Sequence, residues 1–334
     1  MNGTLVQTCD TLLLDLDGVV YAGSAAIPHA VDVLSAARAD GVQLAFVTNN
    51  ASRTPESIAD HIADLGLPVD PAEVVTSAQA GARMLGERLH AGAPVLVVGG
   101  EGLRRAVAER GFAVVDSAAA QPAAVIQGFS PDVGWRQLAQ ATFAIRAGAR
   151  FFATNTDRTI PTGEGIGPGN GLLVGVVAQA TGVQPRVAGK PEVPLMAESV
   201  ERTHAQRPLV VGDRLDTDIE GANNVDLPSL LVLTGVSTLA DLAVAPAAQR
   251  PTFLGLDLRS LHAPPVALGD PLASDGAQTS DEPAWLRWTR DSAVVITAIW
   301  RRLDHARGAQ GPDQALTDSE SAALDQLHAA RPAS

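Results

Sequence analysis

Short apolar runs that end in polar or acidic residues recur along the chain and alternate with segments of helical periodicity. The first two runs are residues 11–14, which end at Asp15, and residues 42–48. Further runs lie at residues 93–100, 123–129, 149–155, 207–213 and 228–235. Runs this short and uniformly apolar are typical of strands covered on both faces. The alternation with helices predicts an α/β fold with mainly parallel sheets.

Composition narrows the classes of partner and compartment. The 334 residues carry a net charge of −13 and one cysteine, Cys9, so no internal disulfide can form. A strongly acidic chain repels phosphate backbones, and we expect no nucleic-acid partner. The N-terminus has no basic segment followed by an apolar one, and no run is long enough for a bilayer, so we expect no membrane partner. We therefore expect a cytoplasmic protein of about two domains.

Among the 24 basic residues only one is a lysine, Lys190; the others are arginines. A biased nucleotide composition of the gene is the simplest explanation for the excess of arginine over lysine. It explains why lysines are missing, but it does not explain why Lys190 is present. Lysine is a compact point charge where arginine is a planar fork, so a tight site can require lysine. Chance survival of a surface lysine at a helix start is the alternative.

Four short segments, each at the end of a strand, supply groups suited to phosphoryl transfer. Asp15 and Asp17 end the first strand, and two such close carboxylates favour a bound cation such as Mg²⁺ or a shared proton. Thr48, Asn49 and Asn50 follow the second strand and could bind phosphate oxygens through side chains and backbone N–H groups. An Asx turn and an ordinary loop are the respective alternatives. Lys190 could neutralise the phosphoryl charge.

The segment VVGDRLDTDIEGANN, residues 210–224, crowds acidic residues at a strand end and helix start. Asp213 directly follows the apolar strand and is placed to reach a metal. Asp218 is interpreted as an outer residue that orients Lys190 or a metal-bound water. Some of these carboxylates would simply favour the helix N-terminus.

DLDGVVY, FVTNN, GKP and GDRLDTDI together resemble the motifs of the haloacid dehalogenase (HAD) superfamily of phosphatases. The resemblance covers residues 8–262 and is nearest to the NagD-like branch of phosphoglycolate, pyridoxal-phosphate, nitrophenyl-phosphate and glycerol-3-phosphate phosphatases. It implies a Rossmann-like core of residues 1–78 and 184–262, with an inserted α/β cap, residues 79–183.

The resemblance also implies roles for the motif residues. Asp15 would be the nucleophile that forms an aspartyl-phosphate, and Asp17 the acid and base. Mg²⁺ would be held by Asp15, the backbone carbonyl of Asp17, and Asp213. Thr48, Asn49, Asn50 and Lys190 would bind the phosphoryl group. We expect hydrolysis of a small phosphate ester, glycerol 3-phosphate first; phosphoglycolate, a sugar or nucleotide phosphate, or a non-catalytic binding protein are the alternatives.

The cap would choose the substrate. ATNTDRTIPTGEGIGPGNGLLVG, residues 153–175, resembles the segment where related phosphatases place their specificity loop. The candidates for contacting the substrate beyond its phosphate are Asp157, Arg158, Thr159 and Ile160. The alternative is that these residues only pack the cap on the core.

The C-terminal part has a different character. Residues 263–283 are rich in Pro, Gly, Ala and Asp and are predicted to be a linker. The extension 284–334 follows, with amphipathic segments at about 284–307 and 317–330 that contain Trp285, Trp288 and Trp300. That much aromatic surface must be covered by the body of the protein, by a second copy of the chain in a homodimer, or by a further domain.

Overall fold

The computed structural model describes residues 3–269, 282–308 and 315–332. Contacts divide the chain into two compact units, Met1–Ala45 with Thr203–Ser334, and Phe46–Arg202. The division differs from the predicted core and cap boundaries, which stay a prediction. The predicted linker falls mainly on residues 270–281, outside the described residues.

A six-stranded sheet has the strand order β15-β14-β13-β1-β4-β5. Strands β1, β13, β14 and β15 pair in parallel, as do β4 and β5, and nearly all their residues are buried. The α/β fold with parallel sheets is thus confirmed. The strands are β1 (Thr11–Leu14), β4 (Gln43–Thr48), β5 (Val74–Thr76), β13 (Pro208–Gly212), β14 (Ser229–Val232) and β15 (Phe253–Gly255).

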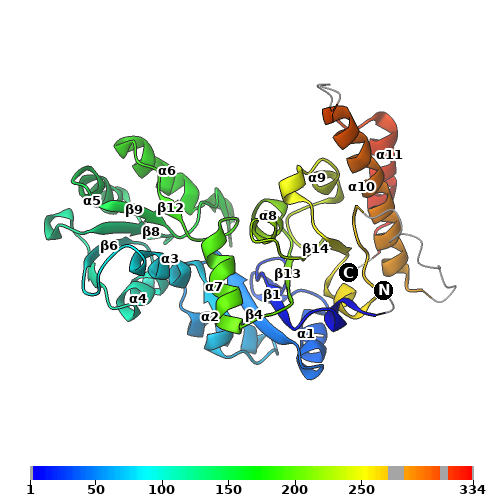
Figure 1. Ribbon diagram of the computed structural model, residues 1–334, viewed down its shortest axis with the longest axis horizontal. Helices are drawn as coiled ribbons and strands as arrows, with labels where there is room; N and C mark the ends of the chain where they lie inside the picture. Colours follow the sequence, from blue (N-terminus) through cyan, green and yellow to red (C-terminus); the bar gives the residue numbers. More distant parts are fainter. Residues whose placement is uncertain (1–2, 270–281, 309–314, 333–334) are drawn as a thin grey trace. The chain divides into compact units, whose positions relative to one another are not determined.

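Helices and short elements of the first unit surround its strands (Figure 1). Helix α1 ends just before Gly41, whose φ of 87° gives the left-handed turn expected of a C-terminal glycine. The elements are β2 (Tyr21–Ala22), β3 (Ala25–Ala26), α1 (Ala30–Ala39), α8 (Glu220–Asn223), α9 (Leu239–Ala243), α10 (Ala284–Gly308) and α11 (Asp318–Ala329).

The second unit contains a five-stranded parallel sheet in the order β12-β9-β8-β6-β7. Helices α5 and α6 pack on one face of it, where they bury residues such as Leu138 and Val177 against Val125 and Phe151 (Figure 1). The strands are β6 (Pro94–Val98), β7 (Ala113–Val115), β8 (Ala124–Gln127), β9 (Arg150–Ala153) and β12 (Arg186–Val187).

The remaining elements of this unit are the helices and an antiparallel hairpin. Helix α2 begins as predicted, because Thr54 caps it by accepting a hydrogen bond from the Ser57 N–H and Pro55 occupies the first turn. The elements are α2 (Pro55–Asp64), α3 (Ser77–Gly86), α4 (Glu101–Glu109), α5 (Trp135–Arg146), β10 (Thr159–Thr162), β11 (Gly165–Pro168), α6 (Asn170–Thr181) and α7 (Val193–Thr203).

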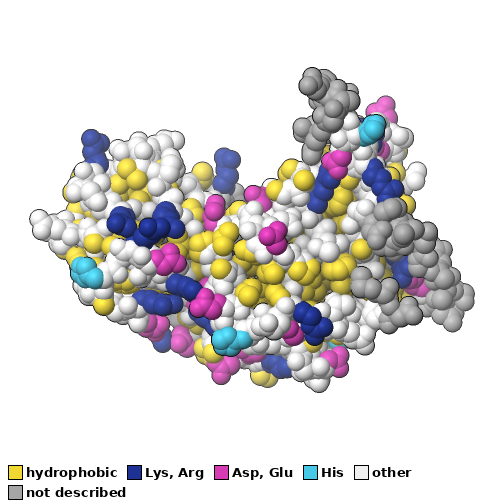
Figure 2. Space-filling model, in the orientation of Figure 1, with side chains coloured by type: hydrophobic (Ala, Val, Ile, Leu, Met, Phe, Trp, Pro, Cys, Tyr) yellow, Lys and Arg dark blue, Asp and Glu magenta, His cyan; other side chains and the backbone are white. Residues whose placement is uncertain are grey.

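The side chains on the face drawn in Figure 2 carry mixed charge, with basic and acidic groups interspersed. Among the charged side chains of the described residues are surface ion pairs, such as those of Arg105 with Glu109 and Glu56. Such exposed pairs contribute little to stability. Among the described residues, no helix combines the length and the apolarity needed to cross a membrane.

The C-terminal helices pack within the first unit. Trp288 and Trp300 are both 5% exposed, and Trp300 donates from Nε1 to the Leu242 carbonyl at 2.8 Å. The Arg250 guanidinium lies 4.7 Å from the Trp300 ring centroid and also pairs with Asp304. The chain itself therefore covers Trp288 and Trp300, and Trp285 is partly buried against the same cluster, while the homodimer stays a prediction.

We expect Trp300→Ala to lower the free energy of unfolding by about 3–5 kcal/mol, because it leaves a cavity and an unpaired Leu242 carbonyl. Urea unfolding of the full chain measures this change. Val294 lies on the same helix but is 49% exposed, so Val294→Ala should change stability by less than about 0.5 kcal/mol. Equal effects of the two substitutions would contradict the packing role.

Candidate active site

Three carboxylates of the first unit converge at the ends of its strands. Leu14 of β1 pairs with Val211 of β13, so Asp15 and Asp213 leave neighbouring strands side by side. Asp218 comes from the helical turn Leu215–Ile219 that follows β13. One carboxylate oxygen from each of the three lies within 4.8 Å of the others. Adjacent parallel strands thus build a cluster from residues about two hundred positions apart.

Glycines allow the surrounding backbone to approach this cluster closely. A Cβ at Gly18, where φ is 89°, would lie 2.6 Å from Asp213 Oδ2. Cβ atoms at Gly212 and Gly235 would overlap the Asp218 and Asp213 side chains respectively. The two deepest carboxylates also accept backbone hydrogen bonds, Asp213 from the Val236 N–H at 2.6 Å and Asp218 from the Arg214 N–H at 3.1 Å.

The donor set fits a hard divalent cation. Asp213 and Asp218 are 0% and 1% exposed, and like charges this close and this buried repel unless a cation or proton compensates them. Carboxylate oxygens are the ligands that Mg²⁺ and Ca²⁺ prefer. Asp17 has an exposed side chain that is not in the cluster. Ligation by its backbone carbonyl, as predicted, stays a prediction.

Lys190 is held firmly within the second unit. Its side chain is buried, with the residue 2% exposed, and Nζ donates to the Val47 carbonyl at 3.0 Å. Its backbone N–H donates to Asn49 Oδ1 at 2.8 Å, and its carbonyl accepts from Asn49 Nδ2 at 3.0 Å. The end of β4 therefore binds Lys190 at its peptide group and at its ammonium. The solvent-facing alternative for this lysine is wrong.

The polar residues at the end of β4 and directly after it form hydrogen bonds with the backbone of their own loop. Thr48 Oγ1 accepts from the Asn50 N–H at 3.0 Å, and Asn50 Oδ1 accepts from the N–H groups of Ser52 and Arg53. Asn49 donates from Nδ2 to Asp157 as well as to Lys190, so both amide hydrogens are used inside the protein. Phosphate binding by these residues stays a prediction. Because the side-chain amide of Asn49 is already occupied, its predicted phosphate contact would be made by its backbone N–H.

The four predicted specificity residues separate into two groups. Asp157 contacts Asn49, at 3.1 and 3.2 Å from its two carboxylate oxygens. Arg158 is exposed, while Thr159 and Ile160 begin the β10–β11 hairpin. Of these four residues, Asp157 is thus the one that contacts the loop after β4, and substrate contacts by all four remain predictions.

Two residues that the sequence analysis did not single out join this network. Asn155 donates from Nδ2 to the Asn49 carbonyl at 2.7 Å, and Ser77 donates from Oγ to the same oxygen at 2.6 Å. Asn155 lies two residues after the end of β9 and Asn49 one residue after the end of β4, and each asparagine directly follows a threonine. The repeated Thr-Asn pair close to a strand end was the available signal.

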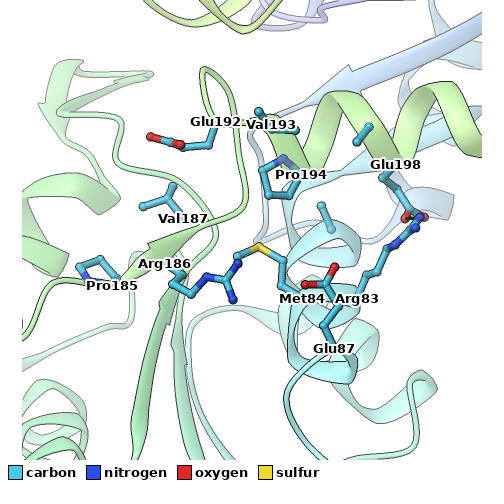
Figure 3. Close-up of a pocket in the computed structure, with 12 residues that line it drawn as sticks. Arg83, Met84, Glu87, Pro185, Arg186, Val187, Glu192, Val193, Pro194 and Glu198 are labelled. Atoms are coloured by element: carbon cyan, nitrogen blue, oxygen red, sulfur yellow. Dashed lines mark hydrogen bonds and ion pairs between the residues drawn. The ribbon is translucent and has the colours of Figure 1, made fainter. Parts of the chain in front are cut away.

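A groove of about 530 Å³ lies elsewhere in this unit, over helices α3 and α7 and strand β12 (Figure 3). None of the predicted site residues lines it. At one side Arg83 and Glu198 point toward each other and pair at 2.7 Å, and Arg202 binds the other Glu198 oxygen. Burial raises the pKa of Glu198, but the hydrogen bonds and charges of the two guanidinium groups outweigh it and hold the pKa below its ordinary value.

The chain matches known proteins along most of its length. The family described as haloacid dehalogenase-like hydrolase matches residues 12–113, and a second, HAD-hydrolase-like family matches residues 187–261. The chain is 49% identical over 295 residues to a D-glycerol 3-phosphate phosphatase of Mycobacterium tuberculosis, covering 88% of this chain and 80% of that protein. It is 38% identical over 232 residues to an acid sugar phosphatase of Staphylococcus aureus, covering 69% and 88%.

Solved structures give the same picture. A glycerol phosphate phosphatase from M. tuberculosis, in complex with magnesium, matches with a TM-score of 0.83 and 41% identity, over 97% of this chain and 98% of that chain. A thermostable NPPase from Geobacillus stearothermophilus matches with a TM-score of 0.68 and 32% identity, over 75% and 97%. At 97% coverage, the mycobacterial match includes the C-terminal helices.

The lowered pKa of Glu198 predicts a pH-dependent stability difference. A carboxylate with a lowered folded-state pKa stabilises the fold above its unfolded pKa, near 4.5, and loses this contribution as pH falls through the folded value. We expect Glu198→Gln to lower the urea midpoint near pH 7, and the gap to wild type to narrow below pH 4.5. Glu192 is exposed at the lip of the groove, so Glu192→Gln should show no such gap. A gap for Glu198→Gln that is independent of pH would contradict this account.

Proposed function

Because the chain belongs to the haloacid dehalogenase-like hydrolases and is a phosphoric monoester hydrolase, we propose that it converts glycerol 3-phosphate to glycerol and inorganic phosphate. The cluster of Asp15, Asp213 and Asp218 is the observation that carries the chemistry. The choice of ester is supported by 49% identity to the mycobacterial D-glycerol 3-phosphate phosphatase.

In the proposed reaction a carboxylate oxygen of Asp15 attacks phosphorus, and the bond between phosphorus and the ester oxygen breaks. Asp17, as the carboxylic acid, gives its proton to the departing glycerol oxygen. The same carboxylate then takes a proton from water, whose oxygen attacks the aspartyl-phosphate and releases inorganic phosphate. Two steps with one acid–base group thus restore both residues. The exposure of Asp17 is compatible with contact to an incoming alcohol and water.

Positive and hydrogen-bonding groups must stabilise the charge of the transferring phosphoryl group. Lys190 supplies the ammonium in this proposal, and Thr48, Asn49 and Asn50 supply hydroxyl and N–H donors. Two observations support these roles: Lys190 is the single lysine of the chain, and its burial suits an ammonium whose electrostatic effect is not screened by water.

We propose Mg²⁺ as the cofactor, held by Asp15, Asp213 and the backbone carbonyl of Asp17. The mycobacterial phosphatase structure in complex with magnesium and the all-oxygen carboxylate cluster support this choice. When bound, the ion would neutralise negative charge on the nucleophile and the phosphoryl oxygens. Asp218 would orient the ligands of the ion. Its carboxylate lies in the same cluster as those of Asp15 and Asp213, which is closer to the ion's place than the outer position expected from the sequence.

The alternatives differ in the ester or in the presence of catalysis. The acid sugar phosphatase relative favours a sugar phosphate as the second candidate. Phosphoglycolate and nucleotide phosphates use the same chemistry. A non-catalytic protein would have no need for a buried carboxylate cluster, which costs stability by repulsion.

A panel of phosphate esters tests the substrate. We expect kcat/KM to be highest for glycerol 3-phosphate, ahead of sugar phosphates, phosphoglycolate and nucleotides, with phosphate release as the measurement. Asp15→Asn should reduce release to background for every ester, because the nucleophile is gone. Activity that survives Asp15→Asn would contradict the mechanism, and a higher kcat/KM for a sugar phosphate would overturn the choice of ester.

Removal of metal tests the cofactor in two ways. A chelator should abolish phosphate release, and added Mg²⁺ should restore it. Mg²⁺ should also raise the thermal unfolding midpoint of the wild type, because a ligand that binds only the folded state stabilises it. Asp213→Asn should lose this shift. Asp216 pairs with Arg214 at the surface, so Asp216→Asn should keep it. A shift that is unchanged in Asp213→Asn would place the ion elsewhere.

A further inference from the structure

We propose that Asp157 is a positioning residue that acts through Asn49 to hold Lys190 in place. This inference rests on the proposed phosphatase function, in which Lys190 binds the phosphoryl group. It gives Asp157 a part in binding the phosphate that all substrates share, in place of contact with the alcohol part of the substrate that the sequence suggested.

The Asn49 amide makes a two-sided contact with the Lys190 peptide. Oδ1 accepts from the Lys190 N–H at 2.8 Å, and Nδ2 donates to the Lys190 carbonyl at 3.0 Å. The second Nδ2 hydrogen goes to Asp157. A shift or rotation of this amide therefore moves the Lys190 backbone, and with it the start of the only ammonium side chain in the sequence.

Asp157 fixes which way the Asn49 amide faces. An ionised carboxylate can only accept hydrogen bonds, so the amide nitrogen must face Asp157. The amide oxygen is then directed to the Lys190 N–H, the pairing that this backbone donor requires. Charge-assisted hydrogen bonds of this kind are stronger than those between neutral groups. A neutral amide at position 157 would accept a weaker hydrogen bond and would not exclude the reversed orientation.

The Lys190 segment packs closely against Asn49. A Cβ at Gly189 would lie 2.5 Å from Asn49 Oδ1 and 2.6 Å from the Thr154 carbonyl oxygen. The Asn49 carbonyl is in turn held by Asn155 and Ser77. Glycine at position 189 thus allows the chain to lie directly on the Asn49 amide.

The backbone around Asp157 is held in place by hydrogen bonds and close packing. Its N–H donates to Asn155 Oδ1 at 3.2 Å, and its carbonyl accepts from the Gly171 N–H at 2.8 Å. Cβ atoms at Gly169 and Gly171 would overlap the backbone of residues 156–157. The start of α6 therefore clamps this segment, which suits a group that must hold its partner's orientation more than one that adapts to different substrates.

The two roles for Asp157 predict different substrate dependence. A residue that positions Lys190 affects the phosphoryl group, which every ester contains, whereas a residue that touches the alcohol affects some esters more than others. Misplacement of a binding group by about 1 Å can cost about a hundredfold in rate. We therefore expect Asp157→Ala to lower kcat/KM by about 10- to 100-fold, equally for glycerol 3-phosphate and p-nitrophenyl phosphate.

The experiment compares Asp157→Ala and Asp157→Asn with wild type on these two esters, and measures inhibition by inorganic phosphate. Phosphate inhibition should weaken in parallel with kcat/KM, and Asp157→Asn should retain more activity than Asp157→Ala. Asp132 is an exposed aspartate of the same unit, and Asp132→Asn should match wild type. A loss confined to one ester, or unchanged phosphate inhibition, would overturn the proposal.

A double-mutant cycle with Asn49→Ala separates action through Asn49 from a general structural effect. If Asp157 acts through Asn49, Asp157→Ala should cause no further loss of kcat/KM in the Asn49→Ala background. Additive losses would overturn the proposal. If glycerol 3-phosphate is not the substrate, the same test can be made with p-nitrophenyl phosphate, provided that the wild type hydrolyses it. If the wild type releases phosphate from no ester, the proposed function itself is refuted.

Discussion

The constraint on which the site depends is a cluster of carboxylates at the ends of parallel strands, two of them fully buried, whose mutual repulsion must be compensated. Pairing of β1 with β13 places Asp15 beside Asp213, and the turn after β13 adds Asp218. Such an arrangement costs stability unless a cation or proton compensates it. The glycines at 18, 212 and 235, which give up side-chain contacts to let backbone approach these carboxylates, are consistent with a site maintained for chemistry.

The second unit solves the opposite problem, a buried ammonium. Lys190 is 2% exposed, and the end of β4 offers it a carbonyl acceptor and a side-chain amide that binds its peptide group. The hydrogen bonds from Asn155 and Ser77 converge on Asn49, so one residue connects the β4 end, the segment after β9 and the Lys190 loop. Such support suits the proposed role of Lys190, because a group that stabilises developing negative charge must be held in place beforehand.

The tryptophans of the C-terminal helices show that the same sequence feature is compatible with more than one structure. Three tryptophans in the tail required cover, and the sequence could not decide between the body of the chain, a second copy and a further domain. The structure covers Trp288 and Trp300 within the first unit, where their indole N–H groups donate to the carbonyls of Leu327 and Leu242. The apolar surface and the polar edge of each ring are thus both satisfied.

The sequence by itself determined the α/β class, the strand ends that bear Asp15, Thr48 and Asp213, and the helix start at Thr54. These features are local: uniformly apolar runs mark strands covered on both faces, and a Thr-Pro pair marks a helix start. The groups that carry the proposed chemistry follow directly from those positions. Their mutual contacts could not be predicted from local patterns.

Only the tertiary structure decided that Asp218 shares the cluster with Asp15, that the Asn49 amide is occupied by Lys190 and Asp157, and that Asn155 takes part at all. Each of these contacts, except that between Asp213 and Asp218, joins residues about a hundred or more positions apart. Strand order and register set such distances, whereas residue spacing along the chain does not. An asparagine or aspartate that follows a strand looks the same in the sequence whether it binds a ligand or holds a neighbouring residue. Only its contacts in the folded protein distinguish the two roles.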